Sequence, residues 1–69
     1  MSIKERMKAN GISQVDMIFA LRKRGIDIQP PMMSSILNGV YTYPKAERVL
    51  AECEKVLDEY ERKRRESDT

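Results

Sequence analysis

The strongest constraint in this 69-residue sequence is a series of signals that begin and end helices at short intervals. Ser13 is a good N-cap residue, and Gly25 interrupts the apolar pattern that follows it. Pro30-Pro31 fits the first turn of another helix. Backbone N–H groups in that turn make no hydrogen bond within the helix, so proline, which has no N–H, loses nothing there. Asn38-Gly39 then supplies a stop. Residues 13–39 are therefore predicted to form two helices joined by a short turn.

Two further helices are predicted on either side of this pair. Ser2 and the glutamate three residues later form a capping-box pattern for a helix over residues 2–10, and Gly11 supplies its left-handed stop. Pro44 fits the first helical position of a long last helix that reaches about Arg65. Four segments have helical spacing and none alternates with period two, so we expect an all-α fold of four to five helices with a long C-terminal helix.

Apolar spacing predicts which helices form the core. The helix that follows Ser13 is apolar on nearly every side, Val15 and Phe19 included, so other helices should surround it. Apolar residues spaced alternately four and three positions apart form a stripe along the last helix. The second half of this stripe is expected to extend beyond the reach of the three short helices. A second copy of the chain would cover that part; the alternative is a helix that folds back on its own domain. The predicted dimerisation residues are Cys53, Val56, Leu57 and Tyr60.

Length and composition narrow the class of protein. A chain of 69 residues makes one domain, and a core of this size rarely supplies more than about 3–5 kcal/mol, which favours oligomerisation. We expect the domain to span residues 1–65, with a flexible tail over residues 66–69. One cysteine and no histidine exclude an internal disulfide and remove the usual general base and commonest metal ligand.

No apolar run reaches the ~20 residues of a membrane span, and no signal peptide is visible. These features predict a cytoplasmic protein that is not an enzyme and has no metal or cofactor. Cys53 is interpreted as a small buried hydrophobic residue.

Basic residues are concentrated in the first two thirds of the chain. Residues 1–48 carry eight Lys and Arg against four Asp and Glu, whereas residues 49–69 carry five against seven. The positive part coincides with the predicted helix pair, as binding to nucleic acid requires. For the run Arg22-Lys23-Arg24, stabilisation at the negative end of a helix dipole is an equally good explanation.

The ordered set of motifs resembles the Cro/repressor type of helix-turn-helix protein found in bacteriophages and prophages. Gly11-Ile12-Ser13-Gln14 is similar to the opening of the first motif helix in that family, and residues 28–39 are similar to its recognition helix. Residues 37–46 are similar to the following loop and helix of small phage-encoded members. The resemblance covers about residues 2–57 and implies a lambda-repressor-like domain that binds operator DNA as a homodimer.

The resemblance also implies individual contacts. It places phosphate contacts at Gln14 and Asn38, base-facing positions at the start of the third helix, and a base-reaching position in the loop that follows. The predicted DNA-binding residues are Gln14, Gln29, Pro31, Met32, Ser34, Ser35, Asn38, Tyr41, Tyr43 and Lys45. Two departures from the family pattern stand out: residues 13–30 are several residues longer, and the base-facing positions lack side chains suited to bidentate base recognition. Gln29 remains the best conventional reader.

Two functions are compatible with these patterns. The first is a sequence-specific transcriptional regulator of phage or prophage type, such as a repressor, whose third helix enters the major groove. The second is a protein-binding module on the same scaffold that modulates a larger repressor. Its uncharged face, with Pro31, Met32 and Ser35, would then dock on a protein surface, to which methionine adapts well.

Overall fold

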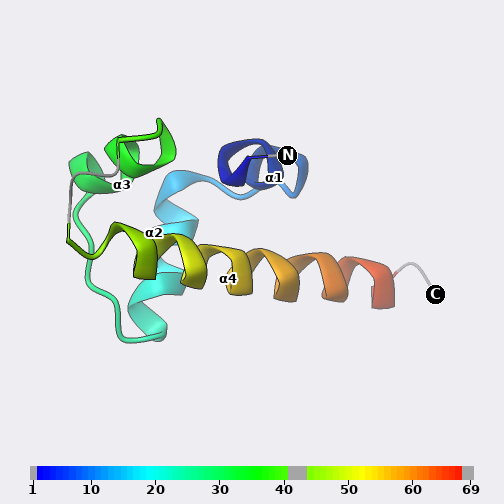
Figure 1. Ribbon diagram of the computed structural model, residues 1–69. Helices are drawn as coiled ribbons and strands as arrows, with labels where there is room; N and C mark the ends of the chain where they lie inside the picture. The colour runs from blue at the N-terminus through cyan, green and yellow to red at the C-terminus, as the bar shows by residue number, and fades with distance from the viewer. Residues whose placement is uncertain (1, 41–43, 68–69) are drawn as a thin grey trace.

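The computed structural model describes residues 2–40 and 44–67 (Figure 1). These residues form four α-helices and no strand: α1 (Ile3–Ala9), α2 (Gln14–Lys23), α3 (Pro30–Leu37) and α4 (Ala46–Ser67). The predicted all-α fold with a long C-terminal helix is confirmed. In Figure 1, α4 is a long rod; α1 and α3 lie on one side of it, and α2 crosses it.

The first two helices begin with the same reciprocal hydrogen bonds. The Ser2 hydroxyl accepts from the Glu5 N–H at 3.2 Å, and the Glu5 carboxylate accepts from the Ser2 N–H at 3.1 Å. Ser13 and Asp16 repeat this pair at 3.1 and 3.0 Å. Each box satisfies N–H groups that the helix itself leaves without partners. The bond from the backbone N–H is also the main reason why the pKa of each carboxyl lies below its ordinary value.

The first three helices end in a common motif, which is clearest at the end of α2. The Gly25 N–H donates to the Arg22 carbonyl at 3.0 Å, and the Ile26 N–H donates to the Leu21 carbonyl at 2.9 Å. This Schellman arrangement requires a left-handed residue, and Gly25 has φ = +86°. It turns the chain back so that Ile26 is buried against the helix that it follows. The stops predicted at Gly11 and Gly39 have the same hydrogen-bond pattern.

One hydrophobic core joins the four helices. Helix α2 packs against α3 and α4, and α1 packs against α4. No polar or charged side chain among the described residues is buried, so apolar burial is the main source of stability. The largest fully buried side chains are Met17, Leu21, Ile28, Met33, Ile36, Val49, Cys53 and Leu57.

The second half of α4 lies closer to the core than the sequence predicted. Leu57 is 0% exposed and Val56 is 3% exposed, so the expectation that the stripe extends beyond the other helices is wrong for both residues. The reason is that both α1 and α2 pack against α4, and this packing was not visible in the spacing of α4 itself. Cys53 is also fully buried, as interpreted, and burial raises the pKa of its thiol to about 11. Of the four predicted dimerisation residues, only Tyr60 is exposed.

Helix α2 is less covered than predicted. Met17, Ile18 and Leu21 face the core, but Val15 and Phe19 are 58% and 53% exposed. Residues four apart share one side of a helix, so these two form an outward apolar strip. The expectation of a surrounded helix is wrong because neighbouring helices cover only part of its circumference.

The limits of α4 also differ slightly from prediction. The Lys45 carbonyl accepts from the Val49 N–H at 2.9 Å, so the helix begins at Ala46 and Pro44 lies before its N-cap. At the other end the helix continues to Ser67, two residues into the predicted tail.

Candidate nucleic-acid interface

The outer side of α3 gathers most of the predicted DNA-binding residues. Met33 and Ile36 anchor the helix in the core, which turns the opposite side outward. Helix α3 contains no charged residue along its length. At its start, the Gln29 side chain makes no cap hydrogen bond, and it is exposed. The remaining predicted residues here are exposed Pro31 and Asn38 and half-buried Met32, Ser34 and Ser35.

A side-chain hydrogen bond fixes α3 relative to α2. The Gln14 amide Nε2 donates to the Pro30 carbonyl oxygen at 3.0 Å, and so joins the first residues of the two helices. The amide has a second N–H and a carbonyl oxygen, which this bond leaves for another partner. Gln14 thus holds the helix pair together and still presents a donor at the start of α2, where the resemblance places a phosphate contact.

Lys45 makes a similar connection from the start of α4. Its Nζ donates to the Asp27 carbonyl oxygen at 3.0 Å, which ties the turn between α2 and α3 to the last helix. An ammonium group has three donors, so one bond to a carbonyl leaves two for phosphate oxygens. The predicted contacts at Tyr41 and Tyr43 lie outside the described residues.

Helix α1 adds two lysines that the sequence-based prediction did not include. Lys4 and Lys8 lie one turn apart and line a depression of about 440 Å³ together with Gln14 and Leu37. The Lys4 Nζ donates to the Asn38 side-chain oxygen at 3.0 Å, so α1 lies beside the end of α3. The i, i+4 spacing of the lysines was visible in the sequence, but their position next to α3 depends on how α1 packs.

Other basic residues belong to the body of the protein. The Arg6 guanidinium pairs with Asp58 at 3.0 Å and Glu61 at 2.9 Å, which clamps α1 to α4. Arg24 pairs with two glutamates of α4, Glu52 and Glu59. Hydrogen bonds from these arginines are the main reason why the pKa values of Glu61 and Glu52 are below their ordinary range.

The three basic residues at the end of α2, Arg22 to Arg24, each lie in a different environment within the fold. Arg24 binds α4, and the Arg22 guanidinium lies 5.4 Å from the centre of the Phe19 ring, within cation–π range. Lys23 lines a groove between α2 and α4. Gln14, at the other end of α2, is the residue that bonds to α3. The structure does not bring this run to the outer side of α3.

Comparisons with protein-family models, curated proteins and solved structures find no match for this chain. Among the described residues, no helix combines the length and apolarity needed to cross a membrane. The same residues contain no cluster of histidine, cysteine and carboxylate side chains arranged to hold a metal ion. The chemistry of the α3 surface is therefore the main guide to function.

Proposed function

We propose that this protein is a sequence-specific DNA-binding regulator that places α3 in the major groove. The observation that carries the proposal is the uncharged outer side of α3, flanked by donors from three other helices. Those donors are Gln14, Lys45 and the pair Lys4 and Lys8. Donors beside a groove-reading helix fit phosphate binding, which positions a protein on DNA, while the helix itself reads base edges.

Base recognition would rest on the first turns of α3. Gln29 has an unengaged amide of the kind that bonds adenine N6 and N7 together. Pro31 and the exposed part of Met32 suit van der Waals contact with thymine methyl groups, and Ser35 can bond a base or a phosphate. Such a surface favours A·T-containing sites and lacks the Arg or Lys that commonly reads guanine.

The sequence resemblance supports the biological class of the proposal. A regulator of phage or prophage type would act by occupying an operator as a homodimer, with two copies of α3 in half-sites about 34 Å apart. The cytoplasm, where the DNA lies, is the corresponding location.

Selection of binding sites from random duplex oligonucleotides tests this proposal. The selected site should then be measured by fluorescence anisotropy over a range of salt concentrations. We expect the Lys4→Ala, Lys8→Ala double variant to bind all sequences more weakly and to reduce the salt slope by about 2. Arg62→Ala, an exposed cation on α4, serves as the matched control and should leave the slope unchanged.

Gln29→Ala tests base reading separately, because it should change the preference among sites without lowering the salt slope. A folded protein that binds no duplex at low salt would contradict the DNA proposal. That result would favour the alternative, in which the same uncharged face binds another protein.

A further inference from the structure

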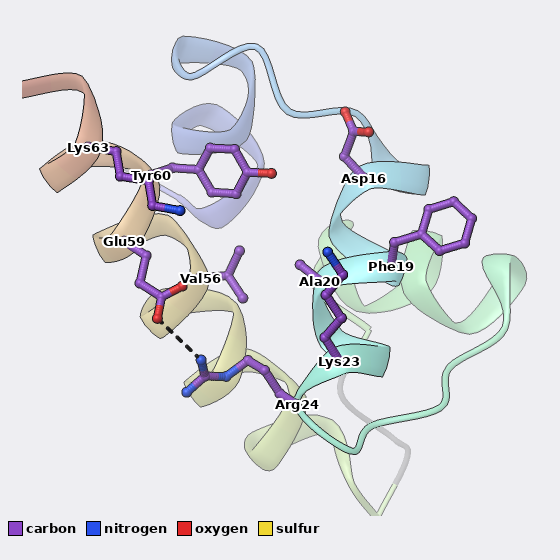
Figure 2. A pocket seen from close by; sticks show the side chains of 9 residues that line it. All are labelled: Asp16, Phe19, Ala20, Lys23, Arg24, Val56, Glu59, Tyr60 and Lys63. Carbon is purple, nitrogen blue, oxygen red and sulfur yellow. Dashed lines mark ion pairs between the residues drawn. The ribbon is translucent and has the colours of Figure 1, made fainter. Parts of the chain in front are cut away.

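A groove of about 520 Å³ lies between α2 and the second half of α4 (Figure 2). Ala20 and Val56 contribute small apolar side chains to it, and the ion pair between Arg24 and Glu59, at 3.6 Å, bridges its two walls. The groove is separate from the outer side of α3, and the proposed DNA contacts do not use it. Its lining residues are Asp16, Phe19, Ala20, Lys23, Arg24, Val56, Glu59, Tyr60 and Lys63.

Large apolar side chains surround this groove and are exposed. Phe19 is 53% exposed, Val15 is 58% exposed and Tyr60 is 41% exposed. In Figure 2 the Phe19 ring points outward, away from the groove, whereas the Tyr60 ring points from α4 towards α2. The face therefore carries a protruding aromatic ring beside a hollow. A second copy on this face would bury the ring together with the hollow.

The charges on the two walls are arranged in opposite order. Along the α4 wall, Lys63 lies at one end and Glu59 nearer the other, whereas the α2 wall has Asp16 opposite Lys63 and Lys23 towards the opposite end (Figure 2). A two-fold axis parallel to the groove exchanges the walls between copies. Lys63 then meets Asp16 of the second copy, and Glu59 meets Lys23 of the second copy.

The nearly balanced charge of this face allows a second copy to approach it. The groove residues include three basic and two acidic side chains, so two such faces repel each other only weakly. Complementary pairs at the rim of an interface set register and exclude wrong orientations. The pattern on this face is complementary to itself.

We propose that the α2–α4 face, meaning the groove residues together with Val15, binds a second copy of this chain in a two-fold dimer. This inference deepens the homodimer part of the proposed function by naming its surface. A standard interface buries about 800 Å² per partner, which is roughly one sixth of the 4836 Å² surface of the chain. The contact must therefore extend beyond the groove, along the outward strip of α2 and the exposed side of α4.

Sedimentation equilibrium without DNA tests the proposal. We expect the wild type to dimerise at tens of micromolar and Phe19→Ser to raise the dissociation constant at least tenfold. Val40→Ser is the matched control, because Val40 is 45% exposed but lies after α3 and does not line the groove. Circular dichroism on each variant establishes that the fold is retained, which half-exposed Phe19 should permit.

Cross-linking provides a second measurement. The thiol of Cys53 is fully buried, so a single introduced cysteine is the reactive one. Tyr60→Cys with a short bifunctional maleimide should give a covalent dimer in good yield, whereas Val40→Cys should not. Wild type that stays monomeric at several hundred micromolar, or a Phe19→Ser variant that dimerises as well as wild type, would overturn the proposal. A monomer that still binds single DNA half-sites would overturn the dimer surface and leave DNA binding intact.

Discussion

The seam between α1 and α4 and the outer side of α3 use polar groups in opposite ways. At the seam, Arg6 binds two carboxylates of α4, and the Arg64 guanidinium donates to the Ala9 carbonyl at 3.2 Å and to the Asn10 side chain at 2.8 Å. Helix α3 has no charged residue, and among the described residues the flanking Gln14 and Lys45 side chains each donate one hydrogen bond, to a backbone carbonyl. The seam satisfies its charges within the chain, whereas the side chains beside α3 have donors left after one intramolecular bond each.

This contrast separates residues that hold the fold from the residues that we propose bind DNA. Changes in the core and at helix ends should lower the free energy of unfolding. Changes on α3 should leave it nearly constant and act on binding. Comparing the stability of variants in the two regions tests that separation.

The largest loss of stability should come from Leu57→Ala. Leu57 is 0% exposed, and truncating a buried leucine to alanine costs about 2–5 kcal/mol because contacts are lost and a cavity remains. Urea denaturation of wild type and variant measures the difference. Tyr60→Ala is the control, because Tyr60 lies three residues later and its side chain is exposed. It should lower the free energy of unfolding clearly less. A loss below about 1 kcal/mol for Leu57→Ala would place the second half of α4 outside the core.

Gly25→Ala should have the next largest effect. Gly25 has φ = +86°, and a left-handed conformation costs a residue with a Cβ about 1–2 kcal/mol. An added Cβ meets no atom within 4 Å, so the loss is conformational and no clash contributes. Gly25→Asn should lose less, because asparagine tolerates this conformation better. Thermal unfolding followed by circular dichroism compares the two, and equal losses would argue against a conformational origin.

Ser13→Ala should destabilise the protein by about 1 kcal/mol, because the Asp16 N–H loses its acceptor at the start of α2. Ser13→Asn is the control, since asparagine caps helices as well as serine does. In chemical denaturation, the Ser13→Asn variant should have a free energy of unfolding close to that of wild type and higher than that of Ser13→Ala. The reverse order would show that the capping box contributes little here.

Acid should weaken the seam. The pKa of Glu61 is lowered in the folded protein mainly by its hydrogen bond from Arg6, from an ordinary value of 4.5. The unfolded chain therefore binds the proton first, so this stabilisation is complete above about pH 4.5 and is lost as the pH falls through the folded pKa. Glu61→Gln should flatten the dependence of unfolding free energy on pH in this range. If the slope of unfolding free energy against pH were unchanged in Glu61→Gln, the seam would not contribute to acid denaturation.

The smallest effect on stability should come from the α3 surface. Gln29→Ala and Ser35→Ala should change the free energy of unfolding by no more than about 0.5 kcal/mol, because neither side chain makes a hydrogen bond with the described residues. Their effect should be found in DNA binding. Losses comparable to that of Ser13→Ala would show that this surface supports the fold, and would weaken the contrast with the seam.

Local chemistry explains why helix positions could be predicted from sequence. The Ser2 cap and the Gly25 stop depend on hydrogen bonds between residues at most five positions apart, so the neighbouring sequence contains the relevant information. The predicted start at Pro44 was less accurate, because Lys45 provides the first helical carbonyl. The candidate α3 residues were also found from sequence, because the buried stripe of a short helix identifies its opposite side.

Burial across the molecule could not be predicted in the same way, because it depends on which helices pack together. The exposure of Phe19, the burial of Leu57 and the approach of Lys4 to Asn38 all follow from contacts between segments far apart in the chain. An apolar stripe shows that a side of a helix requires cover, but not which segment supplies it. Short-range hydrogen bonding thus made most helix ends readable from sequence, and packing between distant segments decided which helix faces are buried and which are exposed.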